Sequence, residues 1–268
     1  MHAFRFALVL ALAAGLSGCQ TIGKWFGAEE DPNAAGVPQA PPPRIEPNRE
    51  EAARLNLRLG IGYIQSGDYA VAVEKLKKAI EFDDSVAEAH NALGLAHERL
   101  RELGAAEREY ARAVELNPNF APAQLNQARL ACLRGQVGVG EKRLVAMADN
   151  PVGDVTPETA LVEAASCVRT VAPERAEDYL RRAIELNPRA SRAHYDLAVL
   201  LLDRGRATEA RVELQRFHEL AGYSAESLAL GVRIADATGD AALRREYQTL
   251  LQSRFGGSPD ARRLRPPR

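Results

Sequence analysis

Small residues recur along this chain at a fixed spacing of 34 residues. One series, with two extra residues before its fourth member, is Gly60, Gly94, Ala128, Ala164, Ala198 and Val232. A second series, twelve residues further on, is Ala72, Ala106, Gly140, Ala176 and Ala210, and Arg244 stands at its sixth position. A period of this length with small residues at two phases predicts stacked helix–turn–helix units. Such stacks usually present a concave face, so the function is expected to lie in what that face holds.

A glycine at a third fixed phase predicts the turn inside most units. It falls at Gly67, Gly135, Gly205 and Gly239, where it suits the left-handed position just past a helix end. The second unit has Arg101 there and Gly104 three residues later, so this turn is predicted to differ from the others. In the third unit, Gly138 and Gly140 are expected to weaken the second helix by roughly 1 kcal/mol each relative to Ala.

The motifs inside the units resemble the tetratricopeptide repeat. In the first unit these are Leu59-Gly60-Ile61-Gly62-Tyr63, Ala72, Leu76 and Ala79, and in the second they are Leu93-Gly94, Ala106, Tyr110, Ala113 and Pro118. The resemblance implies an all-α fold, a right-handed superhelical solenoid of about six units over residues 51–255. The sixth unit, near 225–255, matches least and is expected to act as a cap. Residues 256–268 are rich in Gly, Pro and Arg and lack an apolar stripe, so we predict a disordered tail.

The first 18 residues read as a lipoprotein signal peptide. Arg5 precedes the apolar run 6–16, which is too short to span a bilayer, and Leu16-Ser17-Gly18-Cys19 resembles the lipobox of bacterial lipoproteins. By that resemblance Cys19 carries the lipid, whereas the alternative is an ordinary secretory signal with a chance Cys. Gln20 follows in place of the Asp that retains such proteins at the inner membrane, which implies the periplasmic face of the outer membrane. Residues 19–50, with their prolines and glycines, are predicted to form a flexible linker.

The composition offers little for catalysis or for nucleic acid. The formal net charge is −1, far from the clustered Lys and Arg that phosphate binding requires. His90 and His194 fall at equivalent repeat positions, so repeat packing explains them better than catalysis does. The sequence lacks a Gly-rich phosphate loop and a zinc-helix motif. We therefore predict no enzyme activity, no cofactor, no metal and no small-molecule substrate.

Two cysteines remain besides Cys19. Cys132 and Cys167 lie at helical positions in neighbouring units, without metal-ligand spacing. In an oxidising periplasm they are able to pair, but only the distance between their Cα atoms decides this. Buried free thiols are the commoner outcome for such a pair, and we favour them here while leaving the disulfide open.

The first helix of each unit is expected to line the concave face. Helical spacing places large apolar residues there, most clearly Leu57, Ile61 and Ile64 in the first unit. The full predicted partner-binding groove is Leu57, Ile61, Ile64, Asn91, Leu95, Leu125, Arg129, Leu161, Tyr195 and Val199. Such a largely apolar groove suits an apolar peptide, strand or amphipathic helix. The alternative is that the three residues of the first unit pack under the linker or against the neighbouring helix.

The lipobox, the Pro-rich arm and the six units together resemble the PilW/PilF family of type IV pilus biogenesis lipoproteins. That resemblance implies a pilotin, which binds subunits of the pilus secretin and promotes their localisation and oligomerisation in the outer membrane, and so supports twitching motility. The partners it implies are the secretin and, through the lipid, the outer membrane. An alternative keeps the repeat module and changes the client, as a lipoprotein scaffold for peptidoglycan hydrolases or for outer-membrane protein assembly.

Overall fold

The computed structural model describes residues 48–151 and 153–264. The predicted signal peptide, Cys19, Gln20 and all but the last three residues of the predicted linker lie outside this part of the chain. The described residues belong to one compact unit, residues 47–268. None of their helices is long and apolar enough to cross a membrane.

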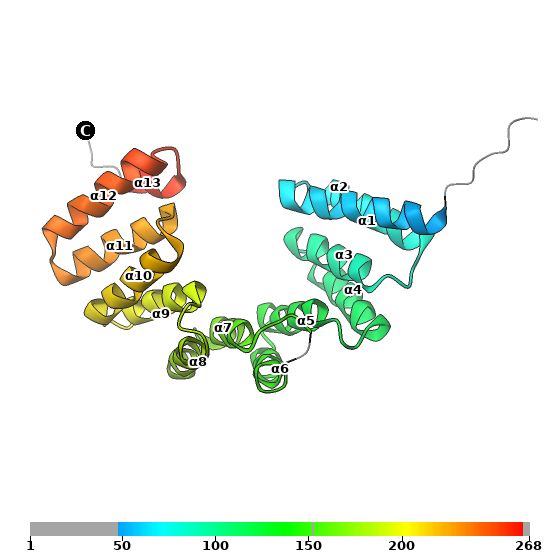
Figure 1. The fold of residues 1–268 in the computed structure, drawn as a ribbon, viewed down its shortest axis with the longest axis horizontal. Helices are drawn as coiled ribbons and strands as arrows, with labels where there is room; N and C mark the ends of the chain where they lie inside the picture. The colour runs from blue at the N-terminus through cyan, green and yellow to red at the C-terminus, as the bar shows by residue number, and fades with distance from the viewer. Residues whose placement is uncertain (1–47, 152, 265–268) are drawn as a thin grey trace, which may run out of the picture. The chain divides into compact units, whose positions relative to one another are not determined.

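The regular structure of the described residues is entirely α-helical. Six helix pairs follow one another, and a short helix closes the series (Figure 1). The helices are α1 (Arg49–Ser66), α2 (Tyr69–Phe82), α3 (Ala87–Arg99), α4 (Leu103–Leu116), α5 (Ala121–Leu133), α6 (Val137–Asp149), α7 (Pro157–Val168), α8 (Pro173–Leu186), α9 (Ser191–Asp203), α10 (Ala207–Ala221), α11 (Ala225–Thr238), α12 (Ala241–Phe255) and α13 (Pro259–Arg263). The predicted tetratricopeptide-like solenoid is confirmed.

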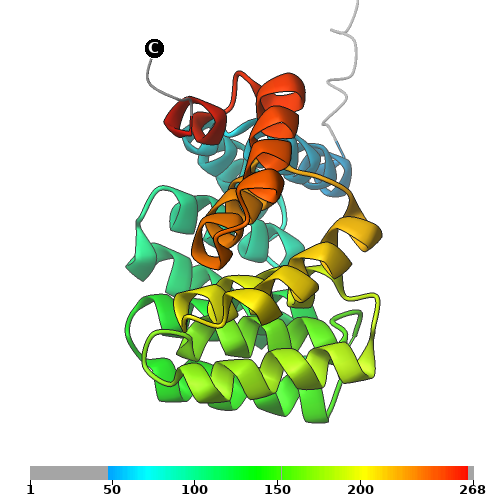
Figure 2. The same ribbon diagram turned by 90° about the vertical axis from the view of Figure 1, so that its left-hand side faces the viewer.

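The two helices of each unit have different neighbours. Each odd-numbered helix from α1 to α9 contacts the next odd-numbered helix, in addition to its own pair partner. In Figure 1, α5 and α7 lie on one side of the stack, while α6 and α8 lie on the other. Figure 2 shows the same layers of paired helices from the side. We call the surface formed by the odd-numbered helices α1 to α11 the inner face.

The small residues of the 34-residue period permit close approach inside each pair. A Cβ added to Gly60 would lie 2.5 Å from Leu76 Cγ, and one added to Gly94 would lie 2.7 Å from the ring of Tyr110. In the sixth unit the equivalent contact joins Gly231 to Tyr247, one residue before the predicted Val232. This shift leaves the helix pair intact because Val232 is itself buried in the core of the last unit.

The turn of the second unit has the same left-handed residue as four of the other turns, contrary to our prediction. Gly67, Gly135, Gly205 and Gly239 adopt φ values between 73° and 87°, as expected. Arg101 adopts φ 66° at the same position and is the one described non-glycine residue with positive φ. Packing of α4 on α3 therefore imposes the turn although no glycine favours it.

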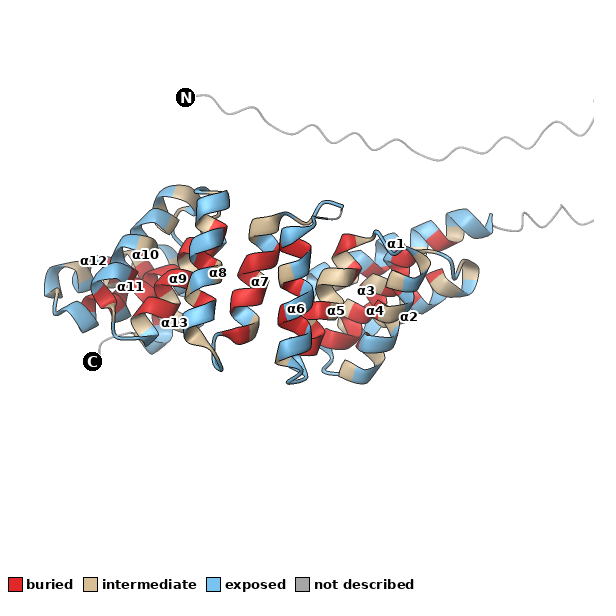
Figure 3. Cartoon of the chain, turned by 90° about the horizontal axis from the view of Figure 1, so that it is seen from below, coloured by how far each residue is buried: buried red, intermediate tan, exposed pale blue. Residues whose placement is uncertain are grey.

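Burial follows the helix surfaces that face one another (Figure 3). Ala and Leu dominate the core, which is continuous from α6 to α11 and includes the fully buried Leu161, Leu197 and Leu201. Separate clusters fill the first, second and last units. Such a division is expected when each unit contacts mainly its neighbours.

The prediction of disorder after residue 255 is wrong for the described part of the tail. Ser258 caps α13 through its side chain, and Pro259 opens the helix. Ala261 is fully buried against the last unit, and the Gln252 side chain donates a hydrogen bond to its carbonyl oxygen at 2.6 Å. The segment was missed because one buried Ala and the partly buried Leu264 produce no apolar stripe in so short a helix.

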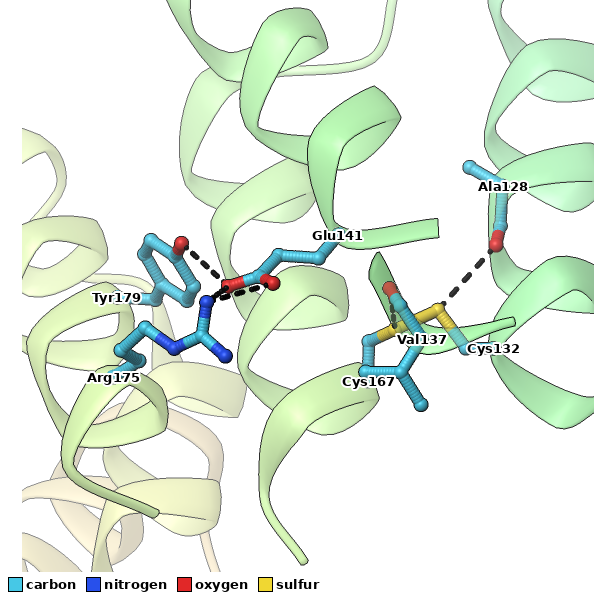
Figure 4. The surroundings of a disulfide bond; sticks show 7 residues. All are labelled: Ala128, Cys132, Val137, Glu141, Cys167, Arg175 and Tyr179. Carbon is cyan, nitrogen blue, oxygen red and sulfur yellow. Dashed lines mark hydrogen bonds and ion pairs between the residues drawn. A yellow bond between two sulfur atoms is a disulfide. The ribbon is translucent and has the colours of Figure 1, made fainter. Parts of the chain in front are cut away.

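Cys132 and Cys167 form a disulfide, which corrects our preference for free thiols (Figure 4). The bond joins α5 of the third unit to α7 of the fourth, with the two Cα atoms 5.4 Å apart. Beside it, Glu141 of α6 accepts hydrogen bonds from two residues of α8, from Arg175 at 3.0 Å and from the Tyr179 hydroxyl at 2.9 Å. The third and fourth units are therefore connected at both their inner and their outer helices.

Candidate partner-binding face

The ten residues of the predicted groove have unequal access to a partner. Ile61 is 39% exposed. The others except Leu161 are partly buried, namely Leu57, Ile64, Asn91, Leu95, Leu125, Arg129, Tyr195 and Val199. Leu161 is 0% exposed and belongs to the core, so its place in the groove was wrong. A residue of an inner helix lies either in the core or in the groove. Helical spacing alone does not distinguish these two places on α7, because this helix is covered on several sides.

The apolar patch predicted on α1 is smaller than expected. Leu57 and Ile64 pack against a cluster that includes Leu76 of α2 and Leu93 of α3. The alternative, packing against the neighbouring helix, therefore holds for these two side chains. Ile61 remains the exposed member of the three.

A second apolar surface of α1 was missed from the sequence. Leu55 and Leu59 are 51% and 41% exposed. The residues 34 positions later, Ala89 and Leu93, are buried, and their helix α3 packs against both helices of the preceding unit. No described helix precedes α1, so the surface that other units use for stacking is open here. We call Leu55 and Leu59 the open edge of the first unit, whereas Ile61, two residues after Leu59, lies on a different side of the helix. The 34-residue spacing contained the signal for this edge.

A polar network crosses from α3 to α5 on the inner face. The Asn126 side chain donates to Asn91 Oδ1 at 2.9 Å, and Arg129 donates to Asn126 Oδ1 at 3.2 Å. Arg129 and the Tyr110 hydroxyl also donate to the carboxylate of Glu98, at 3.2 and 3.0 Å. Burial of the Tyr110 hydroxyl raises its pKa, and the neighbouring carboxylate of Glu98 raises it further, so the hydroxyl stays protonated. Asn91 and Arg129, predicted as groove residues, thus connect the second unit to the third.

A polar hollow of about 530 Å³ continues this surface across further inner helices. Its lining comes from α3, the α3–α4 turn, α5, α7 and α9, and comprises Glu98, Arg99, Arg101, Arg129, Leu133, Glu163, Ser166 and Arg192. We call it the arginine hollow. The prediction of a largely apolar inner face is therefore wrong for its centre. The sequence periodicity did not reveal it because Arg99 and Arg101 lie at a helix end and in a turn.

His90 and His194 occupy matching structural sites. Nδ1 of His90 lies 2.8 Å from Glu109 Oε2, and Nδ1 of His194 lies 2.7 Å from Glu213 Oε2. The Nε2 atom of each ring lies 3.2 Å from a backbone carbonyl oxygen six residues earlier. Both rings are buried and join the two helices of a unit, as the repeat positions predicted. Among the described residues, no group of His, Cys, Asp and Glu side chains is arranged to hold a metal ion.

Comparison with known families defines the class of protein. Models of the tetratricopeptide repeat match residues 62–100, 87–120 and 173–224. Together with the six stacked helix pairs, these matches show that the chain is a tetratricopeptide-repeat protein of the solenoid type.

The particular similarity is to two pilus proteins. The type IV pilus assembly protein PilF of Pseudomonas aeruginosa is 29% identical over 258 residues, which is 95% of each chain. A solved structure of Pseudomonas aeruginosa PilF is 25% identical with a TM-score of 0.61, covering 81% of this chain and 97% of that one. The structure of PilW, described as a widely conserved type IV pilus biogenesis factor, has a TM-score of 0.67 at 22% identity and covers 80% and 98%. The resemblance to the PilW/PilF family is confirmed.

Proposed function

We propose that this protein acts in type IV pilus biogenesis as a pilotin, a lipoprotein that binds secretin subunits and promotes their assembly in the outer membrane. The observation that supports this most is the similarity to PilF, which extends over 95% of both chains rather than over one repeat. A shared repeat motif alone would leave the client open, because many tetratricopeptide proteins have different partners. Similarity across every unit favours the same biological setting.

The open edge of the first unit is our candidate for the first contact with the secretin. Leu55 and Leu59 are exposed on a helix surface whose equivalents in the second unit, Ala89 and Leu93, are buried. A helix or strand of the secretin that is apolar before it oligomerises would cover this edge as a preceding unit would. The partly buried residues Asn91, Leu95, Leu125, Tyr195 and Val199 extend the surface along the inner face.

The membrane anchor of this proposal is Cys19. Acylation there would hold the repeats at the periplasmic face of the outer membrane, where the secretin assembles. Several acyl chains exceed the two signals that stable anchoring requires. Replacement of Cys19 by Ala should release the protein from outer-membrane fractions, and retention of the variant there would contradict the anchor.

Deletion of the gene tests the function as a whole. The deletion strain should accumulate secretin as monomers or in the inner membrane and should lose twitching motility. Normal secretin multimers in the outer membrane would contradict the proposal.

Pull-down from envelope extracts then identifies the client. Recovery of peptidoglycan hydrolases or outer-membrane assembly factors in place of the secretin would favour the scaffold alternative.

A further inference from the structure

The arginine hollow carries more positive than negative charge. Its lining contains four arginines, Arg99, Arg101, Arg129 and Arg192, and two glutamates, Glu98 and Glu163, so its formal charge is 4 − 2 = +2. An adjoining hollow shares Ser166 and Arg192 with it and adds Arg169 and Asp196. Inner-face cations therefore gather at the centre of the solenoid, although the whole chain has a formal charge of −1.

Two of these arginines already neutralise carboxylates of the protein itself. Arg129 lies 3.2 Å from the carboxylate of buried Glu98, and Arg192 lies 2.7 Å from Asp196. For Arg99, Arg101 and Arg169, the described part of the chain offers no carboxylate within 4.0 Å; Arg99 donates to the Tyr69 hydroxyl at 3.3 Å. These three arginines, and Glu163 with the opposite charge, are therefore the charged groups of the two hollows that form no ion pair within the described part of the chain.

Arg101 is held at a cost in backbone energy. It adopts φ 66° where four other turns use glycine. A non-glycine residue in this left-handed region is strained, and such strain is found at functional sites more often than elsewhere. The residue kept there contributes a guanidinium to the hollow. A functional role of the Arg101 guanidinium would explain why Arg occupies a turn position that otherwise favours Gly.

We propose that the arginine hollow binds the carboxylates of an acidic protein segment. The planar guanidinium group matches a carboxylate in a two-point hydrogen-bonded pair. Arg99 and Arg101 of the hollow, and Arg169 of the adjoining one, form no ion pair within the described part of the chain. The hollow extends over α3, α5, α7 and α9. Adjacent helices pack roughly 9–10 Å apart, so three spacings correspond to roughly 30 Å, or about nine residues of an extended segment. An extended stretch with several Asp or Glu residues fits this length and charge.

The proposal deepens the function proposed above by adding an acidic portion to the segment that the inner face receives. It rests on that function only for the identity of the partner. The binding chemistry is tested with a synthetic probe that contains no secretin sequence. Acidic-peptide binding without any effect on the secretin would retain this proposal and contradict the other.

The probe is a fluorescein-labelled nine-residue peptide in which Glu alternates with Gly, compared with the same peptide carrying Gln. Anisotropy titration with the purified full-length chain at low salt should show at least 10-fold tighter binding of the Glu peptide, and the difference should shrink as salt rises. Equal affinities for the two peptides would overturn the proposal. Displacement of the Glu peptide by inorganic phosphate at a lower concentration than by glutarate would overturn it too, by assigning the hollow to phosphate.

Arg101→Gly separates a binding role from a folding role. Glycine relieves the strain, so the melting temperature should be unchanged or higher, while the affinity for the Glu peptide should fall by about 5-fold or more. Arg169→Gln should weaken binding similarly. Arg245→Gln, at an exposed position on α12, is the matched control and should bind as the native protein does. Native affinity in Arg101→Gly and Arg169→Gln alike would overturn the proposal.

Discussion

Cys132 of α5 and Cys167 of α7 are joined by a disulfide that connects the third unit to the fourth, with 35 residues of sequence separation. Neighbouring units of a solenoid otherwise depend on the contacts between their helices. A covalent link at the middle of the stack limits how far the two halves are able to separate when one of them opens.

Replacement of both cysteines by Ala should destabilise the protein by roughly 3–4 kcal/mol, because the loop closed by the bond restricts the unfolded chain. Chemical denaturation with and without reductant measures this. Reductant should lower the stability of the native protein and leave the double variant unchanged. Equal stability of the two proteins under oxidising conditions would contradict a structural role for the bond.

The two glycines of α6 should respond in opposite directions to Ala. A Cβ at Gly140 would lie 2.7 Å from the Ala128 carbonyl oxygen and would also collide with Cys132 Sγ, so Gly140→Ala should cost several kcal/mol. A Cβ at Gly138 meets nothing within 4 Å, so Gly138→Ala should gain up to about 1 kcal/mol of helix stability. Thermal denaturation of the pair tests both signs, and a stabilising Gly140→Ala would contradict the close approach of α5 and α6.

His218 should make the last units less stable in mild acid. The His218 ring lies beside the rings of Tyr223 and Tyr247, and its Nε2 atom lies 3.1 Å from Ser227 Oγ. Burial lowers the pKa of His218 from 6.5 to about 4. Between these pH values the unfolded state binds more protons than the folded state. The stability that His218 contributes is therefore complete above pH 6.5 and is lost as the pH falls toward 4.

The size of this loss is roughly 1–3 kcal/mol, given that the ring is only partly buried. Denaturation at pH 7 and pH 4.5, for the native protein and for His218→Gln, isolates it from the titration of other groups. The native protein should lose more stability over this interval than the variant. Equal losses would contradict a lowered pKa of His218 in the folded state.

The sequence predicted the helix pairs well because two independent signals, the small residues and the turn glycines, coincide in four of the six units. Details were predicted less well where a signal was missing. At Arg101 local propensity opposed the turn, and packing of α3 with α4 prevailed. In α13 the contacts of Ala261 and Leu264 come from α11 and α12, so the tail sequence itself contains little information about its fold.

The candidate site was predicted less completely than the fold. Helical spacing identified the inner helices but did not distinguish fully buried Leu161 from exposed Ile61, since burial depends on how the next unit is placed. The same limit applies to Cys132 and Cys167, whose pairing depends on a distance between two helices. The arginine hollow gathers side chains from four units, and no short motif encodes such a group.

The most direct test of the central claim is the assembly state of the secretin in cells that carry Leu55→Asp and Leu59→Asp. Both side chains are exposed on α1, so the double variant should fold and reach the membrane at native levels. Val212→Asp, at a 62% exposed apolar position on α10, is the control for adding charge to the surface. We predict that secretin multimers disappear from outer-membrane fractions with the double variant and persist with the control. Native amounts of multimer with the double variant would contradict the claim that the open edge receives the secretin.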